Sequence, residues 1–207
     1  MRYKGAERLK GMILWGASLA GAKAVPGAYQ VQLHLNGETL TQDFNILPNP
    51  MAEVTVAQMQ EQFDFVNGVN QTIDKAHQAI KKMRIVHKKL KEFQNNFAED
   101  ESAVELRKQA KKLANALSEV EKALYQTQNR SNQDPLNFPI RLTNKLGHIN
   151  NLVMINDFPP TAQDIAVRDE LTKAIEEQLT IYTRLMDKEV ASFNQAFKEK
   201  ALDYLVQ

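Results

Sequence analysis

Histidines are the residues of this sequence best suited to bind a metal or to transfer a proton near neutral pH, and the chain has four: His34, His77, His87 and His148. His77 and His87 stand ten residues apart, close to three helical turns. Neither has the second histidine or the glutamate, three or four residues away, that helical metal sites use. We therefore expect no metal-binding residues and no cofactor.

A run of cations could contact phosphate groups: Lys81, Lys82, Arg84, Lys88, Lys89 and Lys91. The residues between them belong to an apolar helical stripe, and no exposed aromatic side chains stand ready to stack on bases. Acidic residues are frequent in the last helical segment, so we expect the two segments to pair by charge and expect no nucleic-acid partner. A basic nucleic-acid binder stays as a lesser alternative, and it would bind with a steep dependence on salt.

Catalytic patterns are missing from the sequence. Neighbouring carboxylates such as Glu176 and Glu177 point apart on a helix, so they do not form an acid and base pair. The sequence has no phosphate-binding glycine loop, no nucleophile elbow and no zinc-protease motif. It has no cysteine, which excludes disulfides, thiolate metal sites and cysteine nucleophiles. We expect a protein that is not an enzyme and has no catalytic residues.

Composition indicates a folded chain. With 207 residues, of which 43% are hydrophobic, it can bury a core, and its formal charge of +1 gives no overall attraction to nucleic acid or to an anionic membrane. No apolar run approaches the roughly 20 residues that span a bilayer, so we expect no membrane partner. A signal peptide is an alternative for the N-terminus, where basic residues precede the apolar stretch 12–20, although Glu7, Gly16 and Ser18 interrupt that pattern.

The first fifty residues read as β structure. Apolar residues alternate with polar ones from Tyr29 to Leu35, and Asn36-Gly37 supplies a tight hairpin turn. Leu40 and Phe44 continue the pattern on the return strand, so we expect the two strands to share a buried face. The segment 12–15 could add a further short strand.

The remaining chain reads as helices. Thr55 and Gln58 form a capping box that starts a first helix of roughly 60 Å, and apolar residues three and four apart continue it to Phe97. A second helix follows the acidic cluster 99–101, and a third, shorter one covers 142–153. Thr161 and Asp164 start the last, nearly straight helix, which we expect to reach close to the C-terminus. Short connections favour antiparallel neighbours. The predicted fold is mainly α: an antiparallel four-helix bundle over 51–207, preceded by a hairpin-containing segment over 1–50.

Two parts of the sequence resemble a known family. The N-terminal part carries Arg2-Tyr3, Met12-Ile13-Leu14-Trp15-Gly16 and Pro26-Gly27-x-Tyr29-x-Val31-x-Leu33, and the helical part carries Gln62-Phe63-Asp64-Phe65 and Pro135-Leu136-Asn137-Phe138-Pro139-Ile140-Arg141-Leu142-x-Asn144-Lys145. These motifs resemble the C-terminal region of secreted bacterial proteins with a sortilin-like, Asp-box β-propeller, often labelled glycosyl hydrolases. Where that family has Asp-Pro after the hairpin, this chain has Asn49-Pro50.

This resemblance implies a partial immunoglobulin-like segment over 1–50 and a helical tail over 51–207. It implies that Met1 is an internal start, that the N-terminus is a strand region, and that any hydrolytic site lies in the propeller. The expected function is that of a non-catalytic accessory module of an exported protein, in the periplasm or outside the cell. The expected partner is its own propeller region, with a homodimer through the β segment as a further possibility.

An alternative function is that the tail completes a carbohydrate-active site of the parent enzyme. Arg141 and Asn144 are the polar residues that could project toward such a site, and both follow a proline-framed loop into the third helix. Residues in that position more often lock the start of a helix. We therefore assign no site residues.

Overall fold

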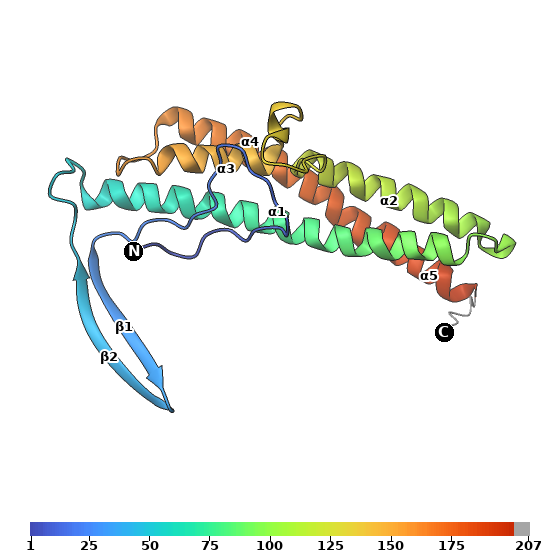
Figure 1. Ribbon diagram of the computed structural model, residues 1–207, viewed down its shortest axis with the longest axis horizontal. Coiled ribbons are helices and arrows are strands. Elements are labelled where there is room, and N and C mark those ends of the chain that lie inside the picture. The colour runs from blue at the N-terminus through green and yellow to red at the C-terminus, as the bar shows by residue number, and fades with distance from the viewer. Residues whose placement is uncertain (201–207) are drawn as a thin grey trace.

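The computed structural model describes residues 1–200 and shows a long helical rod with a β-hairpin projecting from one end (Figure 1). The hairpin pairs strand β1 (Gly27–Leu35) with strand β2 (Glu38–Ile46). The α-helices of the rod are α1 (Val56–Asn96), α2 (Val104–Leu124), α3 (Leu142–Val153), α4 (Ala162–Arg184) and α5 (Ala191–Glu199). The prediction of a mainly α fold with a short hairpin before it is confirmed.

Local signals set the helix starts. Thr55 accepts a hydrogen bond from the backbone of Gln58, and the Gln58 side chain bonds back to the Thr55 backbone. Thr161 and Asp164 form the same reciprocal box before α4. Each box satisfies N–H groups that a helix start would otherwise leave open, so both predicted starts are confirmed.

The helices are arranged along the rod in three legs. Helices α2 and α3 follow each other end to end, and both run antiparallel to α1, which spans the rod (Figure 1). Helices α4 and α5 return along them as the third leg. The loop between Tyr125 and Arg141 contains two prolines and interrupts the middle leg without reversing the chain, so α2 and α3 are not antiparallel neighbours.

The first 26 residues pack on the helices rather than standing apart from them. They run as two extended stretches alongside α1 and α3 (Figure 1), and Ala6, Leu9, Leu19 and Ala22 are buried in the same core as the helices. The expected domain boundary at residue 50 stays a prediction.

The expected short strand over 12–15 is wrong. This stretch is a loop within the described chain, because the N–H groups of Ile13 and Trp15 bond to side chains and not to a neighbouring strand. The N–H of Ile13 donates to the Tyr125 hydroxyl at 3.0 Å, and that of Trp15 donates to Asn144 at 2.8 Å.

The last helix changes its type along its length, which its sequence pattern does not predict. Between α4 and α5 the residues Leu185–Val190 form a π-helical segment, in which each turn holds about one residue more than an α-helix. The helix continues to Glu199, and residues 201–207 lie outside the described part.

The expected charge pairing between the first and last helices is also wrong. Arg84 of α1 pairs with Glu121 of α2, and Lys81 pairs with Glu7 of the N-terminal segment. No ion pair within residues 1–200 joins α1 to α4 or α5.

Candidate interaction surface

The hairpin has one apolar face and one polar face. In its register Tyr29 lies opposite Phe44, and Leu33 lies opposite Leu40, all on one face. The other face carries polar pairs such as Gln32 opposite Thr41. Asn36 and Gly37 have φ angles of 51° and 84°, the left-handed geometry that the predicted tight turn requires.

The apolar face is open to solvent, so the expectation of a buried face is wrong for this chain by itself. Val31, Leu33 and Leu40 are 52%, 57% and 63% exposed. The hairpin projects from the rod instead of folding onto it (Figure 1), which agrees with this exposure within residues 1–200. A two-stranded hairpin alone is marginally stable in water, and this one lacks the layer that its pattern calls for.

Both edges of the hairpin are unpaired in the described chain, which has a two-stranded sheet. Strand β2 carries the charged residues Glu38 and Asp43, which discourage pairing with another chain. Strand β1 carries no Lys, Arg, Asp or Glu over its nine residues. Such an edge accepts a further strand readily.

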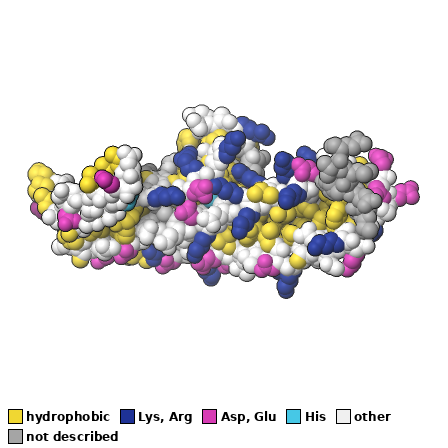
Figure 2. Space-filling model, turned by 90° about the horizontal axis from the view of Figure 1, so that it is seen from below, with side chains coloured by type: hydrophobic (Ala, Val, Ile, Leu, Met, Phe, Trp, Pro, Cys, Tyr) yellow, Lys and Arg dark blue, Asp and Glu magenta, His cyan; other side chains and the backbone are white. Residues whose placement is uncertain are grey.

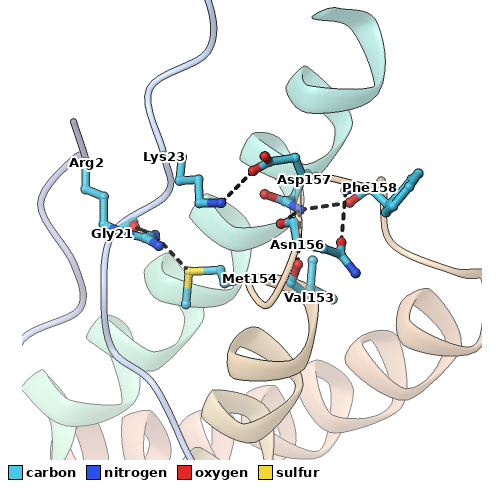
Figure 3. A network of polar contacts seen from close by, with 9 residues as sticks. Arg2, Gly21, Lys23, Val153, Met154, Asn156, Asp157 and Phe158 are labelled. Carbon is cyan, nitrogen blue, oxygen red and sulfur yellow. Dashed lines mark hydrogen bonds and ion pairs between the residues drawn. The ribbon is translucent and has the colours of Figure 1, made fainter. Parts of the chain in front are cut away.

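A polar network fixes the root of the hairpin to the loop between α3 and α4 (Figure 3). Lys23, just before β1, forms an ion pair with Asp157 of that loop. Arg2 donates to the backbone carbonyl of Gly21 at 2.9 Å. Tyr29 at the base of β1 donates its hydroxyl to the Val25 carbonyl at 2.8 Å.

Gln62 of α1 holds the loop that carries Asp157. Its side-chain nitrogen donates to the carbonyls of Val153, Asn156 and Phe158 at 3.0, 2.9 and 2.8 Å. Gln62 is buried, and the three carbonyls converge on one amide group with two hydrogens. The amide therefore gathers the end of α3 and the following loop around α1.

Buried asparagines hold the N-terminal segment. Asn144 of α3 accepts from the N–H of Trp15 and donates to its carbonyl, at 2.8 and 2.9 Å. Asn70 of α1 donates to the Ala20 carbonyl at 2.9 Å and accepts from Asn150 of α3 at 3.1 Å. These amides supply the backbone of an irregular segment with the hydrogen bonds that a sheet would otherwise give it.

Three charged or ionisable residues of α1 hold Glu7. Asp74 accepts from the Glu7 N–H at 2.6 Å, and His77 Nδ1 lies 2.6 Å from the Glu7 carbonyl. Lys81 pairs with the Glu7 carboxylate, and this hydrogen bond lowers the pKa of Glu7. Since a carbonyl only accepts, His77 carries its proton on Nδ1, and its buried Nε2 has no partner within residues 1–200. Burial lowers the pKa of His77.

We expect this histidine to make the fold sensitive to acid. The unfolded chain binds a proton at His77 near its ordinary pKa of about 6.5, whereas the folded chain resists it, so stability falls as pH drops below about 6.5 toward the lowered folded pKa. Urea unfolding at pH 7.5 and 5.5 measures this loss, and His77→Gln should reduce the difference between the two pH values. An unchanged pH dependence in that variant would assign the acid sensitivity to other groups.

The histidines lie apart from one another. His34 sits on the hairpin with Nδ1 2.8 Å from the Thr39 hydroxyl, and His148 lies 2.6 Å from the Gly16 carbonyl. His77 is buried and His87 half-buried on α1. No group of three or more His, Asp or Glu side chains in the described chain could hold a metal ion.

Arg141 and Asn144 also differ in their places. Asn144 is buried and fully engaged with the Trp15 backbone, while Arg141 precedes α3 with its Nε buried and without a described partner. The sequence did not predict the roles of Asn70 and Asn150, which hold the N-terminal segment and each other. Their one signal is that polar residues occupy positions on the apolar stripes of their helices.

No protein-family model, curated protein or solved structure matches this chain. None of the helices in residues 1–200 combines the length and the apolar character needed to cross a bilayer.

Proposed function

We propose that this chain is a non-catalytic C-terminal accessory module of an exported β-propeller protein, placed in the periplasm or outside the cell. Its hairpin docks on the β structure of the propeller-bearing region, and the helical rod serves as a spacer or interaction surface. The resemblance of the sequence to sortilin-like proteins suggests this partner. The observation that carries the proposal is the exposed apolar face of the hairpin beside an uncharged edge strand.

The size of the hairpin favours a larger β partner over a second copy of the chain. Nine residues at about 3.4 Å each, in two strands about 4.8 Å apart, give a face on the order of 300 Å². Two such faces would bury on the order of 600 Å² together, below the roughly 1,000 Å² expected of a specific interface. A partner that covers the face and also extends the β1 edge removes this shortfall.

Neither alternative function, completion of a carbohydrate-active site or binding of nucleic acid, has a comparable observation in its favour. The amide of Asn144 is committed to the Trp15 backbone and cannot also contact a substrate without releasing it. The cations Arg84 and Lys88 are in ion pairs with Glu121 and Glu92, which weakens the case for phosphate contacts.

A binding experiment tests the proposal. The probe is a sortilin-like β-propeller that carries the first strands of its immunoglobulin-like domain, mixed with this chain and followed by light scattering behind a sizing column. The double variant Leu33→Lys with Leu40→Lys places charges on the apolar face, and we expect it to abolish the complex. Its matched control, Gln32→Lys with Thr41→Lys, changes the opposite pair on the polar face and should bind like the unmodified chain.

Two results would contradict the proposal. One is a complex that forms equally well with the Leu33 and Leu40 variant. The other is a dimer of the chain alone that needs the same two leucines and excludes the propeller, because a second copy would then be the natural occupant of the face.

A further inference from the structure

A groove runs between α2 and the π-helical segment at the junction of α4 and α5. Its volume is about 680 Å³, within the range of about 300–1,000 Å³ typical of small-molecule sites. Leu113 of α2 and Leu185 of the π-helical segment form an apolar floor, and both are nearly buried. Phe193 of α5 lines one end and packs edge-on against Phe93 of α1.

Small residues keep the groove open. Ala116 on α2 and Ser192 on α5 both line it. The extra residue per turn in Leu185–Val190 shifts the following side chains around the helix axis, at the point where the last leg borders the groove. Such π-helical turns occur frequently at functional sites.

The rim of the groove is basic. Lys112, Arg184 and Lys188 line it, and none of the three forms an ion pair with any of residues 1–200. Glu189 is the acidic residue of the lining. Figure 2 shows the same combination on a broader scale, with apolar side chains open to solvent between Lys and Arg side chains toward the C-terminal end of the rod.

An apolar floor with unpaired cations along its rim fits a ligand that has an apolar body and an anionic head. A purely apolar ligand would leave the cations without a counter-charge, and a small inorganic anion would leave the half-buried apolar side chains of Ala116 and Phe193 in water. The guanidinium of Arg184 presents paired donors that match a carboxylate.

We propose that this groove binds a single-chain amphiphile with an anionic head, of the fatty-acid carboxylate class. The acyl chain lies along Ala116 and Phe193 over the floor of Leu113 and Leu185, and the carboxylate is held by Arg184, Lys188 and Lys112. This site lies on the bundle and does not depend on the docking of the hairpin.

Calorimetric titration with sodium dodecanoate, below its micelle concentration, tests the proposal. We expect saturable binding, and no binding of dodecyltrimethylammonium, which has the same tail and a cationic head. The double variant Arg184→Gln with Lys188→Gln should bind dodecanoate at least tenfold more weakly. Ala116→Trp should block the groove and remove binding. Lys111→Gln, an exposed cation of α2 outside the groove, should bind like the unmodified chain.

Circular dichroism and a thermal midpoint establish for each variant that it is folded. Arg184, Lys188 and Lys111 are exposed, whereas Ala116 is half-buried, so this check matters most for Ala116→Trp. Equal binding of both head groups, or full binding by a folded Ala116→Trp, would overturn the proposal. Binding to anionic phospholipid vesicles without binding to free dodecanoate would overturn it as well, because the ligand would then be a membrane surface.

Discussion

Replacing Gly21 by alanine is expected to lower the free energy of unfolding by about 3 kcal/mol, at the upper end of overpacking effects. A Cβ at this position would lie 1.7 Å from the Tyr3 carbonyl oxygen and 2.4 Å from its carbon, and both are backbone atoms that cannot turn aside. The two extended stretches of the N-terminal segment would have to separate. That movement breaks the 2.9 Å hydrogen bond from the Tyr3 N–H to the Ala22 carbonyl.

Urea unfolding followed by circular dichroism measures this change. Gly68→Ala is the matched control, because a Cβ there meets nothing within 4 Å in an exposed part of α1. That control should raise stability by about 0.5–1 kcal/mol, as alanine favours a helix over glycine. If Gly21→Ala were as stable as the unmodified chain, the close pairing of the two stretches would be wrong.

Removing the amide donors of Gln62 is expected to cost about 2–4 kcal/mol. Gln62→Glu keeps the size of the side chain but replaces two N–H donors with a carboxylate, which faces the carbonyls of Val153, Asn156 and Phe158 without a donor. Desolvation of the charge adds to the loss of the hydrogen bonds.

Urea unfolding and limited proteolysis together test this expectation. The loop 154–160 should become more open to cleavage, since Gln62 is what gathers it around α1. Gln60→Glu, on an exposed position two residues earlier, should change stability by less than about 0.5 kcal/mol. A cleavage pattern unchanged in Gln62→Glu would show that the loop is held by other contacts.

The helices were predictable because their signals are local. The capping boxes at Thr55 and Thr161 and the apolar stripes define their starts and faces within a few residues of sequence. The direction of the chain after the loop 125–141 has no such signal. An apolar stripe indicates that one face of a helix is buried, but it does not indicate which helix covers that face. The sequence pattern is therefore the same for a rod of three legs and a bundle of four.

The interaction surface was predictable only in part. Alternation and the Asn36-Gly37 turn predict the hairpin, but the exposure of Leu33 depends on what lies beside it in space. In the N-terminal segment the backbone pairs only briefly, between residues 1–6 and 19–24, and other backbone hydrogen bonds go to side chains such as Asn70 and Asn144 from distant helices. Sequence patterns reveal long regular backbone pairing, and this segment is too irregular to show one.

The length of α1 has a geometric consequence. Its 41 residues, at 1.5 Å each, make it about 60 Å long, and it runs without interruption from the hairpin root to the cluster of Phe93, Phe97, Phe193 and Phe197 near its other end. A partner bound to the hairpin would therefore lie about one length of α1 away from this aromatic cluster. The separation between the two ends of the molecule is therefore set by the length of one helix.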